Sequence, residues 1–231
     1  MAAFGDTYQE QRVEVGIIGG TGALGRGLAS RWLVAGVDVA LGSRDAGRAA
    51  TAAEELRAEL GEVPGTVRGL GNVEAATLPV VVLAVPYDGL DAVLEPLVDA
   101  VAGRIVVSAV NPLAFDAKGP YNEAVAEGSV AEAIAVKLPG ARMTAAFHSV
   151  SSRELGRLDR PLDDDVPVVG DDDEAVATVA ELANRIDGIR AYAAGALRMS
   201  APLETLTALI ISVNKRHKAH AGLRLSRLEP R

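Results

Sequence analysis

Hydrophobic residues along this chain fall into two alternating patterns. The first is a short, nearly continuous apolar run, which occurs at residues 13–18, 37–41, 66–70, 79–85, 105–110 and 143–147. Runs of this length rich in Val, Ile and Leu predict strands. An unbroken run such as 79–85 is typical of a parallel strand buried on both faces.

The second pattern spaces apolar residues three or four apart, as Leu24, Leu28 and Trp32 do, and predicts helices between the strands. Ser129 and Glu132 have the spacing of a capping box. Further helices are expected at 45–60, at 90–101 with a kink or a late start at Pro96, and from Ser129 to about Pro139. Strands alternating with helices predict an α/β fold, a doubly wound and mostly parallel Rossmann-type sheet with right-handed crossovers.

Strict alternation is lost after residue 149. The elements expected there are a long connection at 149–165, an edge strand at 166–169, a strand at 189–192 and helices at 174–186 and about 201–219. The strand at 166–169 is placed at an edge because Pro167 cannot donate a hydrogen bond to a neighbour. Asp171, Asp172 and Asp173 precede a helix, and we interpret them as an N-cap with favourable helix-dipole contacts rather than a metal site.

Three glycines follow the first predicted strand and open the first predicted helix. Gly20, Gly22 and Gly25 have the G-x-G-x-x-G spacing of a dinucleotide-binding turn, in the right order of elements. Gly20 is expected to let the chain reverse, Gly22 to let the backbone approach a pyrophosphate, and Gly25 to allow close helix–strand packing. With free N–H groups at the helix N-terminus, the turn Gly20-Thr21-Gly22-Ala23-Leu24-Gly25 predicts a dinucleotide site.

The end of the second strand distinguishes the two nicotinamide dinucleotides. NAD-binding chains place Asp or Glu there for a ribose hydroxyl, whereas this chain has Gly42-Ser43-Arg44. Ser43 can donate a hydrogen bond to a phosphate, Arg44 offers a planar cation, and Arg48 adds a second cation one helical turn later. The prediction is NADP(H). The alternative is that Ser43 and Arg44 form only a turn.

Composition narrows the classes of function. The 231 residues carry a net charge of -8, which argues against nucleic acid as a partner, and the absence of cysteine excludes disulfides and thiolate catalysis. No apolar stretch approaches the roughly 20 residues that cross a bilayer. We therefore expect a cytoplasmic protein with no membrane partner. Its expected parts are a flexible tail at 1–11, an NADP-binding Rossmann domain at 12–150 and a smaller C-terminal domain at 151–231.

Together with the glycine turn and Ser43-Arg44, three further segments resemble the NADPH-dependent reductases of the deazaflavin coenzyme F420. They are Val166 to Asp172, Leu203-Glu204-Thr205-Leu206-Thr207 and Lys218 to Leu223. The two C-terminal segments are the most particular, and the resemblance covers nearly all of the chain after Gln11. It implies a homodimeric oxidoreductase that transfers a hydride reversibly between NADP(H) and F420.

The resemblance also implies roles for individual residues. Those that match its NADP-binding motifs are Thr21, Gly22, Ala23, Leu24, Ser43, Arg44 and Arg48, with Val85 and Asn111 on the nicotinamide side. Those that match its deazaflavin pocket are His148, Val150, Thr205 and Thr207, of which His148 and Thr207 are assigned to the catalytic step. The chain departs from the family's pattern at Ser149-Val150-Ser151, where Thr-Ile-Pro can stand, and at Ala221, where a bulky apolar residue can lie.

Hydride transfer needs two rings held together away from water, and it needs neither a nucleophile nor a metal. His148 is expected either to hydrogen-bond the deazaflavin or to cap a loop, and Thr205 and Thr207 either to contact the ring or to bond within the last helix. Alternative functions are another NADPH-dependent reductase, ferric or imine, and a non-catalytic NADPH sensor. The helical spacing of Leu203, Leu206, Leu209, Ile210 and Val213 predicts a surface on which two copies pair.

Overall fold

The structure, a computed structural model, describes residues 13–228; the tail expected at 1–11 lies outside them. Within these residues one large sheet has the strand order β10-β9-β8-β5-β4-β1-β2-β3, and β6 and β7 form a separate hairpin. Neighbours in the large sheet are parallel except β8 and β9. The bounds are β1 Glu14–Ile18, β2 Asp38–Ser43, β3 Val67–Gly71, β4 Val80–Leu83, β5 Ile105–Ser108, β6 Leu113–Asp116, β7 Gly119–Asn122, β8 Arg142–Ala145, β9 Asp164–Gly170 and β10 Ile189–Ala193.

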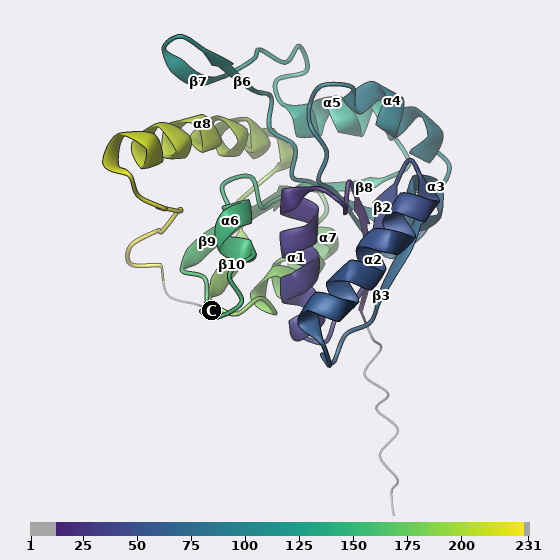
Figure 1. The fold of residues 1–231 in the computed structure, drawn as a ribbon. Coiled ribbons are helices and arrows are strands. Elements are labelled where there is room, and N and C mark those ends of the chain that lie inside the picture. Colours follow the sequence, from purple (N-terminus) through teal and green to yellow (C-terminus); the bar gives the residue numbers. More distant parts are fainter. Residues whose placement is uncertain (1–12, 229–231) are drawn as a thin grey trace, which may run out of the picture.

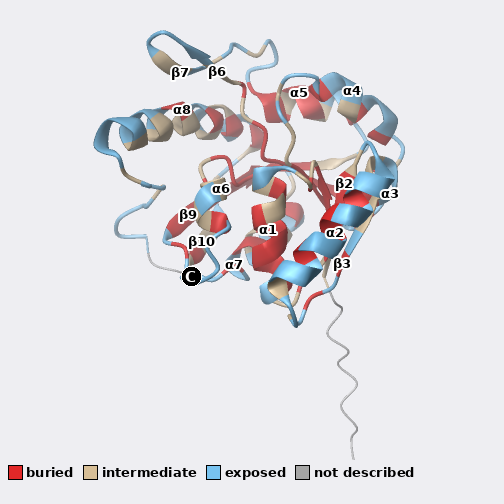
Figure 2. Cartoon of the chain, viewed as in Figure 1, coloured by how far each residue is buried: buried red, intermediate tan, exposed pale blue. Residues whose placement is uncertain are grey.

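Helices cover both faces of this sheet, which confirms the predicted doubly wound fold (Figure 1). One hydrophobic cluster joins the strands to α1, α2, α6 and α7, and a second joins them to α3, α4 and α5. The central strands are therefore buried from both sides (Figure 2). The bounds are α1 Ala23–Val34, α2 Ala46–Leu60, α3 Asn72–Ala75, α4 Leu90–Leu94, α5 Val130–Lys137, α6 Ser152–Leu155, α7 Asp173–Asn184 and α8 Ser200–His217, with 3-10 turns at Glu95–Leu97 and Leu197–Met199.

The N-caps read from the sequence are confirmed. The hydroxyl oxygen of Ser129 accepts the N–H of Glu132 at 3.1 Å, at the start of α5. Asp172 accepts the N–H of Ala175 at 3.0 Å, at the start of α7. Asp172 also accepts two hydrogen bonds from Arg142, at 2.6 and 2.8 Å, and this pairing holds the pKa of its carboxyl well below the usual range.

The strand expected at an edge lies inside the sheet, so that prediction was wrong. β9 is buried throughout and lies between β10 and β8. Val168 faces β10, because its carbonyl accepts the N–H of Ala194 at 2.8 Å. Alternation turns the nitrogen of Pro167 toward β8, whose pairing covers only Val169 and Gly170. A proline is tolerated there because it lies beyond the paired part of β8.

Two other stretches differ from the expectation. Residues 90–101 do not form one helix: α4 stops at Leu94, and a 3-10 turn follows because Pro96 has no N–H for the next helical bond. The hairpin of β6 and β7 was not expected at all. Its turn is held by Asp116, whose side chain accepts the N–H groups of Lys118 and Gly119 at 2.7 and 3.1 Å. Such an Asp–Gly turn is a local signal that the hydrophobic pattern does not contain.

After α8 the chain folds back onto the sheet. Asn214 holds Ala221 through two hydrogen bonds of 2.7 and 3.0 Å, and the N–H of Asp165 donates to the Leu223 carbonyl at 2.7 Å. Beyond residue 150 the chain thus extends the same sheet through β9 and β10 and places α8 beside it. Within the described range, no helix has both the length and the apolar character that a bilayer crossing requires.

Candidate active site

The turn after β1 lies at the carboxyl edge of the parallel strands. Its left-handed residue is Gly19, with a φ of 82°, so the chain reverses there rather than at Gly20 as expected. Gly20 is required for another reason, because a Cβ on it would lie 2.9 Å from the Ile17 oxygen and from the Leu41 Cα. Gly25 packs on this turn, since its Cβ would lie 2.7 Å from the Gly19 oxygen.

Helix α1 begins at this turn with no side-chain cap and no acidic residue in its first turn. Gly22 is the N-cap residue, and a Cβ on it would meet only the Gly19 oxygen, at 3.2 Å, so its outer side is open. The first N–H groups of α1 have no intrahelical acceptor and lie at the positive end of the helix dipole. They can bind an anion such as a pyrophosphate.

The first turn of α2 faces the same space. Ser43 ends β2, Arg44 follows it, and Asp45 is the N-cap, accepting the N–H of Arg48 at 3.1 Å. A cavity of about 440 Å³ opens here, and both arginines and apolar side chains line it. Its lining residues are Gly19, Thr21, Gly22, Gly42, Ser43, Arg44, Asp45, Arg48, Asn72, Ala84, Val85, Pro86, Asp88, Gly89 and Val93.

A polar cluster forms where the ends of β5 and β8 meet α8. The Nδ2 of Asn111 donates to the backbone carbonyl of His148 at 3.2 Å. The Thr207 hydroxyl lies 2.9 Å from that carbonyl oxygen and 3.1 Å from the Oδ1 of Asn111. With one proton it donates to one of them at a time. The cluster ties the C-terminal helix to the carboxyl edge of the sheet.

The side chain of His148 is buried, with 6% of its surface exposed. Neither ring nitrogen makes a hydrogen bond within the described residues. Burial lowers the pKa of the imidazole to about 4, so the ring is neutral at pH 7. A neutral imidazole has one donor and one acceptor, and both are unpaired within the described part of the chain. The preceding residue, Phe147, has a φ of 68°, and its ring packs edge-on against Trp32 at a centroid distance of 5.7 Å.

A buried arginine holds the loop that follows His148. Arg31, on α1, donates to four carbonyl oxygens of this segment, those of Glu154 and Leu155 in α6 and of Arg157 and Arg160 after it. Its burial lowers the pKa of its guanidinium. The loop is thereby fixed to the helix that begins at the glycine turn.

Two neighbouring residues of α8 lie apart from the cluster. The Thr205 hydroxyl donates to the Ala201 carbonyl at 2.9 Å, and Thr205 lines a cavity of about 450 Å³ that also contains Pro112 and Asn122. Glu204, 2% exposed, accepts the N–H groups of Val130 and Ala131 at 3.0 and 3.1 Å. Burial raises the pKa of this carboxyl to about 7. Glu204 therefore fastens α8 to the start of α5.

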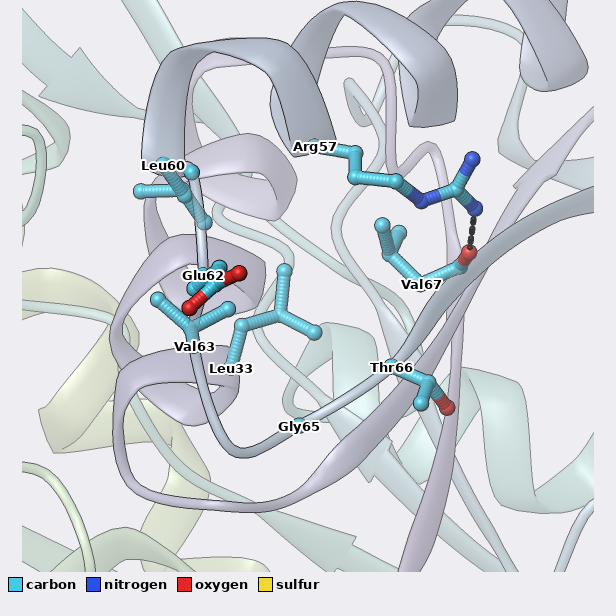
Figure 3. Close-up of a pocket in the computed structure, with 9 residues that line it drawn as sticks. Leu33, Arg57, Leu60, Glu62, Val63, Gly65, Thr66 and Val67 are labelled. Atoms are coloured by element: carbon cyan, nitrogen blue, oxygen red, sulfur yellow. Dashed lines mark hydrogen bonds between the residues drawn. The ribbon is translucent and has the colours of Figure 1, made fainter.

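A further hollow, of about 490 Å³, lies between the end of α2 and the start of β3 (Figure 3). Leu33, Leu60 and Val63 line it, and Arg57 donates to the Val67 carbonyl at 2.7 Å. This is the edge where the parallel strands begin, whereas ligands of doubly wound sheets bind where the strands end. We therefore do not assign it to the active site.

The structure places the residues named from the sequence in two groups. The first cavity is lined by Thr21, Gly22, Ser43, Arg44, Arg48 and Val85. The cluster consists of Asn111, His148 and Thr207, and Val150 is buried two residues after His148. Gly20, Leu24 and Gly25 pack within the fold, Ala23 lines an adjoining hollow, and Thr205 joins neither group.

Sequence reasoning missed two residues of this region. Asn72 lines the first cavity, and the signal for it was its position directly after the third strand. Glu204 joins α8 to α5, a contact that no local pattern announces.

A doubly wound sheet whose open glycine turn faces two arginines defines the class of NADP-binding oxidoreductases. Comparison with known proteins narrows this class. The model of the family described as "NADP oxidoreductase coenzyme F420-dependent" matches residues 14–112. The chain is 36% identical over 222 residues to the F420-dependent NADP reductase of Methanothermobacter thermautotrophicus, covering 94% of this chain and 96% of that protein. It is 35% identical to that of Methanocaldococcus jannaschii, covering 94% and 100%. The chain belongs to the family of F420-dependent NADP reductases.

Solved structures agree with this assignment. A putative F420-dependent NADP reductase from Arthrobacter sp. FB24 superposes with a TM-score of 0.77 at 25% identity, covering 94% of this chain and 99% of that one. An imine reductase from Bacillus cereus superposes with a TM-score of 0.60 at 19% identity, covering 90% of this chain and 63% of that one. The second likeness shows the fold alone.

Proposed function

We propose that this chain transfers a hydride reversibly between NADP(H) and coenzyme F420, with NADP(H) in the cavity after β1 and the deazaflavin at the Asn111–His148–Thr207 cluster. Family membership supports the reaction. The assignment of residues rests on the contacts of this chain. The observation that carries it is the buried, neutral ring of His148 at the edge of the sheet where the arginine-lined cavity opens. Neither of its nitrogens has a hydrogen-bond partner among residues 13–228.

The NADP half of the proposal rests on complementary charge. The open side of Gly22 and the first N–H groups of α1 suit the pyrophosphate. Arg44 and Arg48 suit the 2′-phosphate, because guanidinium groups bind phosphate oxygens with strong, charge-assisted hydrogen bonds. The oxygen of Ser43 accepts the N–H of Asp45 at 3.3 Å, which leaves the hydroxyl proton free to donate to the same phosphate.

The deazaflavin half rests on orientation. Both coenzymes are two-electron carriers, and the hydride passes between their rings. The neutral imidazole of His148 offers one donor and one acceptor to the N–H and carbonyl groups of the deazaflavin. The Thr207 hydroxyl positions the backbone of His148, since it lies 2.9 Å from the His148 carbonyl oxygen. Val150 supplies a buried apolar contact. Thr205, whose hydroxyl donates to the Ala201 carbonyl in a separate cavity, is not assigned to the deazaflavin.

The arrangement of the chain suggests how these tasks are divided. The NADP-binding domain proposed at 12–150 contains the NADP cavity. The smaller domain proposed at 151–231 contains β9, β10 and α8, and α8 completes the deazaflavin site through Thr207. We propose that α8 also forms the interface of a homodimer, because Leu209 and Val213 on it are 59% and 39% exposed. The cytoplasmic location expected from the sequence stays a proposal, which fractionation of cells would test.

The activity is tested with the purified protein, NADPH and oxidised F420. We expect the visible absorbance of the deazaflavin to bleach, and NADP with reduced F420 to restore it. A riboflavin-type flavin and a ferric chelate serve as control acceptors and should react poorly. A protein that binds NADPH but reduces none of these acceptors would be a sensor, and one that reduces only a control acceptor would be another reductase. Either outcome would overturn the proposal.

A further inference from the structure

We propose that Asn72 recognises the adenine base of the dinucleotide by accepting a hydrogen bond from its 6-amino group. This inference rests on the proposed NADP site and adds to it a residue that distinguishes adenine from a 6-oxo purine. Asn72 matches none of the motifs that carried the resemblance.

The position of Asn72 follows from the register of the sheet. Gly71, the last residue of β3, pairs with Ser43, the last residue of β2, in parallel register. Asn72 therefore lies alongside Arg44 at the carboxyl edge, and both residues line the same cavity. A ligand held by Arg44 is within the space that Asn72 borders.

The side chain of Asn72 has an unmet hydrogen-bonding requirement. Its Oδ1 is buried and accepts no hydrogen bond within the described residues. Buried polar atoms are nearly always paired, so this oxygen is matched to a donor that residues 13–228 do not supply. Within the described residues, the packing of β3 and α3 supplies no hydrogen bond to this oxygen.

The chemistry of the cavity selects the donor. Phosphate oxygens are acceptors and fit the donors of this cavity, which are Ser43, Arg44, Arg48 and the N–H groups of the glycine turn. The Oδ1 of Asn72 is itself an acceptor, so it does not bind a phosphate oxygen. Pro86 and Val93 line the same cavity, and their apolar surface suits the flat face of a base. An adenine ring in this cavity offers its 6-amino group as a donor. An asparagine amide pairs with adenine through two hydrogen bonds, accepting from that amine and donating to a ring nitrogen.

The test compares the binding of two probes that differ at one position of the base. These are NADP and nicotinamide hypoxanthine dinucleotide phosphate, in which oxygen replaces the 6-amino group. Dissociation constants are measured by titration calorimetry, without F420 or turnover. The wild-type protein should bind NADP about tenfold more tightly, the value of one good hydrogen bond. Asn72→Ala should bind both probes equally, whereas Asn72→Asp keeps an acceptor and should keep the preference for NADP.

Arg48→Ala is the matched control from the same cavity, and it should weaken both probes by the same factor and keep the preference. Asn72→Ala could instead raise both dissociation constants by the same factor and keep the preference for NADP. Asn72 would then contact the ribose or only support the fold, and the inference would be wrong. Equal binding of the two probes by the wild-type protein would also overturn it, even if the alanine variant failed to fold. A folded wild-type protein that bound neither probe would instead refute the NADP site itself.

Discussion

The hydroxyl of Thr207 lies 2.9 Å from the backbone carbonyl oxygen of His148, although 59 positions separate the two residues. Helix α8 thereby sets the position of a residue whose two ring nitrogens make no hydrogen bond to any of the described residues. The bond makes Thr207 a positioning residue for His148.

Replacing Thr207 by Val removes this bond and keeps the size of the side chain. We expect the single-turnover rate of hydride transfer to fall about 10- to 100-fold, because a small displacement of a reacting ring is costly. The dissociation constant for NADPH should stay unchanged, and Thr207→Ser should restore the rate. Thr178→Val, which removes a similar threonine–backbone bond of 2.8 Å on α7, is the control. A matching loss of NADPH affinity in Thr207→Val would point to a general disturbance of the fold.

Replacing Arg44 by Ala tests the choice of dinucleotide. A charge-assisted contact to a phosphate contributes roughly 1.5–3 kcal/mol, so KM for NADPH should rise on the order of 10- to 100-fold. Activity with NADH should hardly change, because NADH lacks the 2′-phosphate. Arg185→Ala, on an exposed arginine at the end of α7, should affect neither cofactor. Equal losses with NADPH and NADH would show that Arg44 does not bind this phosphate.

The buried ring of His148 makes stability depend on pH. Its pKa falls from an ordinary 6.5 to about 4 on folding, so the unfolded chain binds more protons between these values. The free energy of unfolding should therefore rise with pH from 4 to 6.5, by up to about 3 kcal/mol from this residue. His148→Phe should remove that part of the rise in denaturant titrations, whereas the exposed His217→Gln should not. An unchanged slope in His148→Phe would mean that the ring titrates as in water.

Glu204 makes stability depend on pH in the opposite direction to His148. Its pKa rises from 4.5 to about 7 on folding, so the folded state binds the extra proton and stability is lost as pH rises through this window. Glu204→Gln cannot titrate and keeps one acceptor for the N–H groups of Val130 and Ala131. The free energy of unfolding of Glu204→Gln minus that of the wild type should therefore increase from pH 5 to pH 8. The increase should be on the order of 3 kcal/mol at most. A difference that stays constant over this range would contradict the raised pKa.

The exposed apolar residues of α8 test the proposed assembly. Light scattering should give the mass of a dimer at micromolar concentration, and Leu209→Glu should give that of a monomer, because a buried unpaired charge is costly. Val34→Glu, on a residue of α1 that is 48% exposed, is the control and should leave the mass unchanged. A monomeric wild-type protein would refute the dimer.

Much of this fold follows from local patterns. Unbroken runs such as 79–85 predicted strands buried on both faces, and the structure buries all of the strand that forms there, Val80–Leu83. Caps such as Ser129 and Asp172 were recognisable because an N-cap is decided within four residues. The arginines after β2 could also be predicted, because the carboxyl ends of parallel strands meet at the edge of the sheet where ligands bind.

What the sequence could not supply are relations between distant segments. The central place of β9 depends on where β8 stops pairing, and Pro167 alone points to an edge. The bond between Thr207 and His148 needs the packing of α8, which no periodicity encodes. Gly19 was overlooked because the motif spacing starts at Gly20, although the positive φ belongs to Gly19.

Trp32 is the chain's one tryptophan, and its position makes it an internal optical reporter. Its indole N–H donates to the Leu182 carbonyl at 3.0 Å, while its ring meets Phe147 next to His148. Three stretches that leave the ribosome at very different times therefore converge on one fluorophore. The hydrogen bond of this indole forms only once α7 packs against α1, so its emission reports when these two distant helices come together.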